Sequence, residues 1–159
     1  MRKDVLLKQL LAHVAARIEG FERSARAAHE EATDEGNKAE NKYDTRALEA
    51  SYLAEGQTRQ AFEVAQSLEL LSAFQPPQFG LKDPIDLGAL LLLDGKDEET
   101  WYFIAPCEGG AELQCDGQSV IVLTPQAPLA KLLIGQKLGA SIKMQIGRDR
   151  VSYRVKSLS

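Results

Sequence analysis

The sequence predicts an α+β protein, in which a long antiparallel helical hairpin (a coiled coil) precedes an antiparallel β domain with one short helix. The first observation is a change of composition at residues 75–78, Gln-Pro-Pro-Gln, because residues 1–74 contain no proline and few glycines. The second is a pair of heptad patterns within residues 1–74. The predicted domains are therefore the hairpin, residues 1–74, and the β domain, residues 75–159.

The first helix is predicted from an unbroken pattern of apolar residues at alternating steps of four and three, which forms one seam along a helix. These residues are Leu7, Leu11, Val14, Ile18, Phe21, Ala25, Ala28 and Ala32. The seam changes from leucine and valine to alanine toward its C-terminal end, so that end of the hairpin is expected to be slim.

The second helix carries a seam with the same steps, which mirrors the first about a point between Asn37 and Lys38. Its members are Tyr43, Ala47, Ala50, Ala54, Gln57, Ala61, Val64, Leu68 and Leu71. Seams that reflect through one turn predict antiparallel packing, with a hairpin over residues 5–72 that turns at about residues 34–38. A narrow rod suits insertion into a hole, and the alternative is a spacer or dimerisation arm.

The β domain is predicted from short apolar runs between turn signals. Strands are expected over residues 87–93, 100–105, 119–123, 141–146 and 151–158. Pro128 suits the first position of a short helix through Leu133, which Gly135 closes. Asp94-Gly95, Gly109-Gly110, Asp116-Gly117 and residues 147–150 are expected turns.

The predicted turn of the hairpin, an acidic tip at about residues 33–42, holds the strongest candidate for chemistry. Asp34, Glu35 and Glu40 gather there. Carboxylates on a rigid tip can complete the coordination of a Mg²⁺ ion that another protein only partly holds. Two ordinary roles stay open: the cluster is simply solvated, and Glu40 caps the second helix by accepting the backbone N–H of Asn37.

Several functional classes are excluded by composition and spacing. The net charge of −4 does not fit a basic nucleic-acid-binding protein, and no apolar run approaches the length of a membrane span. The N-terminus has no apolar signal core, and Cys107 and Cys115 are expected to be reduced in a cytoplasmic protein. No nucleophile motif, phosphate loop or metal-spaced histidine pair is present, so an enzyme in its own right is not expected.

Two segments resemble the GreA and GreB transcript cleavage factors. Residues 37–49, Asn-Lys-Ala-Glu-Asn-Lys-Tyr-Asp-Thr-Arg-Ala-Leu-Glu, are similar to the tip of that family, Asp-x-x-Glu-Asn-Ala-Glu-Tyr followed by an alanine-rich helix. Residues 120–139, from Val-Ile-Val-Leu-Thr-Pro to Leu-Ile-Gly-Gln-Lys-Leu-Gly, are similar to its C-terminal Ser-Pro and Gly-Lys segment. The resemblance covers essentially the whole chain and implies that the β domain has the fold of FK506-binding proteins.

The resemblance implies a monomeric transcription elongation factor, in a family associated with transcription regulation and DNA binding. Its partner would be RNA polymerase, entered through the secondary channel, with indirect access to the 3′ end of the nascent RNA and no membrane association. Asp34, Glu35 and Glu40 would then assist the polymerase's Mg²⁺, and the chain would hold no metal alone and no cofactor of its own. The residues implied in partner binding are Asn37, Asn41, Tyr43, Pro125, Pro128, Lys131, Gly135 and Lys137.

The tip departs from the family at two points. Asn37 stands where the family has its first aspartate, and the stretch from Glu40 to Tyr43 is one residue shorter. Three functions follow as hypotheses: a factor that assists transcript cleavage in paused or backtracked complexes, a channel-binding regulator or inhibitor that does not cleave, and a coiled-coil adaptor.

Overall fold

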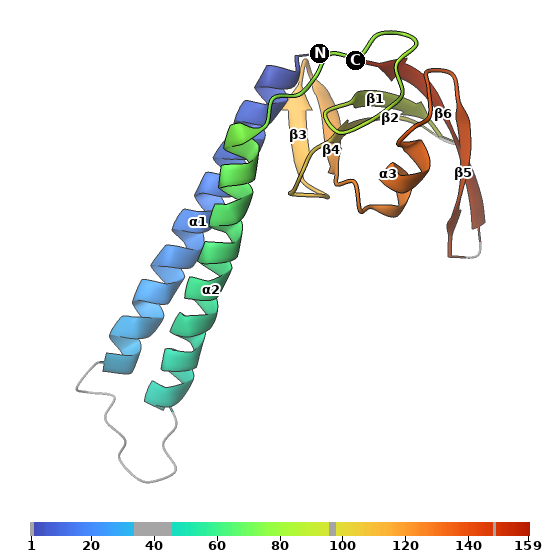
Figure 1. The fold of residues 1–159 in the computed structure, drawn as a ribbon. Helices are drawn as coiled ribbons and strands as arrows, with labels where there is room; N and C mark the ends of the chain where they lie inside the picture. Colours follow the sequence, from blue (N-terminus) through green and yellow to red (C-terminus); the bar gives the residue numbers. More distant parts are fainter. Residues whose placement is uncertain (1, 34–45, 96–97, 148) are drawn as a thin grey trace. The chain divides into compact units, whose positions relative to one another are not determined.

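The computed structural model describes residues 2–33, 46–95, 98–147 and 149–159. Its contacts divide the chain into two compact units, of which the hairpin unit is Ala12–Glu69 and the sheet unit is Met1–Leu11 together with Leu70–Ser159. Figure 1 shows the long helices, the sheet and the short helix of the described residues. No helix in the described ranges is long and apolar enough to span a membrane.

The hairpin unit consists of the greater part of two helices, α1 (Lys3–Thr33) and α2 (Arg46–Ala73), which lie side by side in Figure 1. Most of the predicted seam falls in this unit, and its described members there are buried or half-buried: Val14, Ile18, Phe21, Ala25, Ala28, Ala50, Ala54, Gln57, Ala61, Val64 and Leu68. The predicted helical hairpin is confirmed. The predicted turn, residues 34–38, lies outside the described residues, as do the side chains of Ala32, Tyr43 and Ala47.

The sheet unit has a six-stranded sheet in the order β3-β4-β2-β1-β6-β5 and a short helix, α3 (Pro128–Leu133). Every predicted strand is present, and α3 has the predicted bounds with Pro128 in its first turn. The strands are β1 (Leu90–Asp94), β2 (Glu99–Ile104), β3 (Glu112–Cys115), β4 (Gln118–Leu123), β5 (Ser141–Ile146) and β6 (Asp149–Leu158).

The sheet differs from the expected antiparallel one in a single pairing, because β2 and β4 run parallel. The cause is β3, a four-residue strand that the sequence analysis did not predict. Asp116 and Gly117, with φ of 53° and 77°, form the tight turn of a hairpin that joins β3 to β4. Since β3 takes the edge of the sheet, β4 lies between β3 and β2 and has the direction of β2.

One face of the sheet packs against α3. Leu129 and Leu133 of the helix are buried with Leu91, Leu93 and Ile104, which project from this face of β1 and β2. Beside that cluster, Tyr102 and Tyr153 are half-buried, and burial together with the neighbouring Tyr153 raises the pKa of Tyr102.

The opposite face of the sheet belongs to the same compact unit as the beginning of α1 and the end of α2. This face carries buried Leu90, Leu113, Phe103, Val120 and Val122. Leu6, Leu10 and Leu71 are fully buried in the same unit. The side-chain amide of Gln9 donates to the Gln114 carbonyl (2.6 Å) and accepts from the Gln114 N–H (3.0 Å), which fixes α1 to the edge strand β3.

This packing explains one shift in the seam. Near the start of α1 the completely buried residues are Leu6 and Leu10, whereas the predicted seam residues Leu7 and Leu11 are half-buried. A heptad pattern reports contact with one partner helix, but here α1 has the sheet as a second partner. The predicted domain boundary at residues 74 and 75 remains a prediction about which fragment folds by itself.

Lys3 is a buried cation that joins α1 to the segment between α2 and β1. Its side chain is 7% exposed, and its ammonium donates to the carbonyls of Pro77 (2.5 Å) and Gly88 (3.2 Å). The ammonium also lies 4.8 Å from the centre of the Phe79 ring, a cation–π distance. Burial lowers the pKa of Lys3 to about 8, since desolvation disfavours the charged form.

This lowered pKa predicts a pH-dependent contribution to stability. Between the folded value of about 8 and the ordinary value of 10.5, the unfolded chain binds more protons at Lys3 than the folded chain. Stability from this group therefore rises with pH through that window. Because the two pKa values differ by about 2.5, we expect the wild type to gain roughly 3 kcal/mol relative to Lys3→Met as the pH rises across that window.

Urea unfolding at several pH values measures this difference, with Lys8→Met as the matched control because Lys8 is an exposed lysine of the same helix. Parallel pH profiles for the wild type and Lys3→Met would contradict a buried, titrating Lys3.

Candidate functional site

The predicted tip lies outside the described residues. This applies to the three carboxylates and to three of the expected contact residues: Asp34, Glu35, Glu40, Asn37, Asn41 and Tyr43. α1 ends at Thr33, whose hydroxyl donates to the carbonyl of His29 (2.9 Å), and α2 begins at Arg46. Across the described ranges, no three His, Cys, Asp or Glu side chains form a group that could hold a metal ion. The tip remains a prediction.

The predicted docking residues of the β domain lie in one continuous segment of the sheet unit, residues 124–139. Pro125 precedes α3, Pro128 and Lys131 belong to it, and Gly135 and Lys137 follow it. A turn leads into the helix, since the N–H of Ala127 donates to the carbonyl of Thr124 (2.9 Å). Proline at the start of a helix loses no hydrogen bond, because the first N–H groups have no intrahelical acceptor.

This segment is tied to the sheet unit along its length. Leu129, Ala130 and Leu133 are buried, so one face of α3 belongs to the core. Beyond the helix, the N–H of Gly135 donates to the carbonyl of Ile85 (2.8 Å), and the N–H of Ile85 donates to the carbonyl of Gln136 (2.7 Å). Gly135 has a φ of 84°, which favours glycine and ends the helix. The segment is therefore a fixed surface.

The outward side of the segment combines cations with an apolar side chain. Lys131 and Lys137 are exposed, and Leu132 between them is 38% exposed. Such a surface suits a protein partner with carboxylates around an apolar spot. Leu132 was missed in the sequence analysis, because a six-residue apolar helix does not show which leucine faces outward. We call Pro128, Lys131, Leu132 and Lys137 the α3 surface.

Cys107 and Cys115 are not joined by a disulfide; Cys115 is buried and Cys107 half-buried. The Sγ of Cys115 lies 4.0 Å from the carbonyl oxygen of Arg2, another contact between the first residues and the sheet. Among the aromatic residues of the sheet unit, Phe103 is fully buried, and Trp101, Tyr102 and Tyr153 are half-buried.

No family model and no curated protein matches the chain. Among solved structures, GreA factor homolog 1 (Gfh1) of Thermus thermophilus aligns with 18% identity over 96% of this chain and 92% of its own, with a TM-score of 0.38. Gfh1 of Thermus aquaticus aligns with 14% identity over 95% and 92%, with a TM-score of 0.38. A GreA/GreB elongation factor from Nitrosomonas europaea aligns with 15% identity over 74% and 95%, with a TM-score of 0.34. These three solved structures are of Gre-type factors, the family that the sequence motifs of this chain resemble.

Proposed function

We propose that this chain is a Gre-like transcription elongation factor of the cytoplasm, which binds RNA polymerase and inserts its hairpin tip into the secondary channel. There it acts on paused or backtracked complexes by assisting the polymerase's own transcript cleavage, as an accessory factor without catalytic machinery of its own. The observation that carries the proposal is the folded state of the C-terminal motif. Residues 124–139, which resemble the family, form a rigid, outward-facing surface that includes Lys131 and Lys137.

Two long helices add a second line of support. α1 and α2 extend over 31 and 28 residues, or roughly 45 and 40 Å at about 1.5 Å per residue. Their seam narrows to alanines at Ala25, Ala28, Ala50 and Ala54. A slender arm of this kind has little core for its length, which fits a part that must enter a confined space.

The proposed chemistry belongs to Asp34, Glu35 and Glu40. Carboxylate oxygens are ligands that Mg²⁺ prefers, and this donor set could complete the shell of an ion held by the polymerase. Asn37, a neutral amide, stands where the family has a carboxylate. The wild type is therefore expected to cleave weakly, and Asn37→Asp to cleave faster.

Transcript cleavage by a halted, backtracked RNA polymerase complex tests the proposal. The triple variant Asp34→Ala, Glu35→Ala, Glu40→Ala is expected to bind polymerase nearly as well as the wild type but to lose its effect on cleavage. The matched control replaces three exposed helix carboxylates, Glu22, Glu63 and Glu69, by alanine and changes the net charge equally. A control variant that also loses its effect would assign the result to overall charge.

Polymerase binding, measured separately, tests whether the α3 surface contacts the polymerase. Lys131→Glu combined with Lys137→Glu is expected to weaken binding by about tenfold, because like charges would then face the partner. Absence of binding by the wild type would reject RNA polymerase as the partner. It would favour the third hypothesis, in which the chain is a coiled-coil adaptor.

A second candidate function shares the same docking. The neutral Asn37 and the shorter Glu40–Tyr43 spacing favour a channel-binding regulator or inhibitor that does not cleave. Normal polymerase binding without cleavage, in both the wild type and Asn37→Asp, would support that function over cleavage assistance.

A further inference from the structure

The outer side of α2 exposes large apolar side chains that the hairpin itself does not cover. Leu48, Tyr52 and Phe62 are 53%, 65% and 66% exposed, and all three lie in the hairpin unit. Single exposed apolar residues are common on protein surfaces, so exposure alone identifies nothing. Their spacing is more informative.

These side chains belong to a second heptad stripe. Residues at alternating steps of four and three along α2 are Leu48, Tyr52, Glu55, Arg59, Phe62 and Gln66. Successive helical residues are about 100° apart, so this stripe lies roughly opposite the buried seam residues Ala50 and Val64. α2 thus has two seams, and among the described residues the inner one is buried or half-buried whereas the outer one is exposed. We call these six residues the outer stripe.

The outer stripe is complementary to itself when it is reversed. An antiparallel copy centred on Gln57 would place Tyr52 opposite the second copy's Phe62, and Glu55 opposite its Arg59. The symmetry repeats both contacts, which gives two aromatic pairs and two pairs of opposite charge. A parallel copy would instead stack each charge on its own kind.

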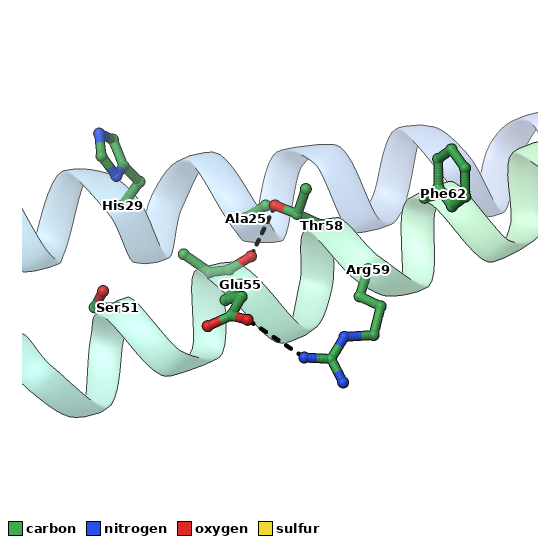
Figure 2. A pocket seen from close by; sticks show the side chains of 8 residues that line it. Ala25, His29, Ser51, Glu55, Thr58, Arg59 and Phe62 are labelled. Atoms are coloured by element: carbon green, nitrogen blue, oxygen red, sulfur yellow. Dashed lines mark hydrogen bonds and ion pairs between the residues drawn. The ribbon is translucent and has the colours of Figure 1, made fainter.

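A groove beside the outer stripe gives a second helix room to approach. It has a volume of about 680 Å³ and is lined from both helices: by Ala25 and His29 of α1, and by Ser51, Ala54, Thr58 and the stripe members Glu55, Arg59 and Phe62 of α2. Figure 2 shows Glu55 and Arg59 on the same helix, joined by an ion pair of 3.4 Å between largely exposed groups. Such an exposed pair contributes little within one chain and can exchange partners.

We propose that the outer stripe is a self-association surface, on which two copies of this chain pack α2 against α2 in antiparallel orientation. The charge pattern selects a second copy as the occupant, because the sequence of apolar, acidic, basic and apolar residues complements its own reverse. The contact covers residues 48–66, about 27 Å of helix at about 1.5 Å per residue. It concerns the free protein and does not depend on the function proposed above; it replaces the monomer that the sequence resemblance implies.

Sedimentation of the full chain over a range of concentrations tests the proposal. The wild type is expected to form dimers reversibly in the micromolar range, whereas Tyr52→Ser with Phe62→Ser is expected to stay monomeric. Leu53→Ser is the matched control, because Leu53 is 53% exposed on the same helix but lies off the outer stripe. A monomeric wild type at the highest concentration reached would overturn the proposal, as would equal loss in the Leu53 control.

A charge exchange tests the predicted pairing. Arg59→Glu would place a glutamate opposite the second copy's Glu55 and is expected to weaken association at least tenfold. Adding Glu55→Arg restores opposite charges and is expected to restore association. Failure of the double variant to recover, with its helical circular dichroism unchanged, would reject antiparallel contact through these residues.

Disulfide cross-linking tests the orientation. A mixture of Tyr52→Cys and Phe62→Cys chains is expected to form a mixed disulfide far faster than either variant forms with itself, and the unmodified chain controls for Cys107 and Cys115. Preferential cross-linking within a single variant would indicate parallel packing and overturn the proposal. Weaker polymerase binding by stripe variants that never self-associate would assign the outer stripe to polymerase instead.

Discussion

Replacing Gly88 by alanine is expected to destabilise the protein by about 2–4 kcal/mol, combining left-handed backbone strain with overpacking. Gly88 has a φ of 89°, and a Cβ atom there would lie 2.5 Å from the Cδ of Pro77 and 3.2 Å from the Cα of Pro76. Proline rings and backbone cannot move aside as a flexible side chain can. The Gly88 carbonyl also accepts from Lys3, so a displaced backbone would disturb that anchor too.

Gly139→Ala is the matched control for this result. Gly139 has a φ of 84°, but no heavy atom would lie within 4 Å of its Cβ, so only the conformational strain applies. We expect a loss of about 1–2 kcal/mol there. Urea unfolding at neutral pH compares the two variants. Equal losses would show that the proline contact contributes nothing, and that the backbone conformation alone requires glycine.

Removal of the hairpin unit is expected to leave a folded sheet unit. A chain in which a flexible linker replaces residues 12–69 retains Leu6, Leu10 and Leu71, which are fully buried in that unit. Residues 75–159 alone lack these side chains and would expose the sheet face that carries Phe103 and Val120. Each lost burial of a leucine removes about 1.5–3 kcal/mol, which is a large share of a small domain's stability.

Thermal unfolding of both fragments measures the difference. The linked fragment is expected to unfold cooperatively, whereas residues 75–159 are expected to bind a hydrophobic dye and lack a sharp transition. A sharp transition of residues 75–159 at the temperature of the linked fragment would show that composition, with its change at residue 75, marks the folding boundary after all.

The hairpin could be predicted because its seam is long and regular. Val14, Ala28, Ala50 and Val64 are buried at predicted positions. A heptad pattern that repeats over many helical turns still predicts a helix when a few of its positions deviate. The bounds of α3 were predicted correctly for a different reason, because Pro128 and Gly135 mark its two ends.

Contacts between distant segments could not be predicted from local patterns. β3 is short, and only Leu113 and Cys115 alternate within it, so the parallel β2–β4 pair that depends on it was missed. The burial of Lys3 was missed for a similar reason. A lysine near the start of a helix is ordinarily solvated. The acceptors of Lys3 are the backbone carbonyls of Pro77 and Gly88, and no pattern of side chains in the sequence identifies such acceptors.

The candidate site was likewise predicted only in part from the sequence. Lys131 and Lys137 were predicted from a motif and are exposed, whereas Leu132 depends on which side of α3 faces the core. The outer stripe was overlooked because Glu55 and Arg59 interrupt its apolar residues, although its heptad spacing was available from the sequence.

Both long helices continue without a break from the sheet unit into the hairpin unit, α1 past Leu11 and α2 past Leu70. Helix length and seam register are therefore separate quantities. Deleting one residue from α1 would move the later residues of that helix by about 100° around its axis, so the seam residues beyond the deletion would no longer face α2. Deleting a matched heptad from each helix would shorten the hairpin unit by about 10 Å and keep both seams in register. The length of the hairpin unit can thus vary in steps of a heptad without any change at the contacts of Lys3.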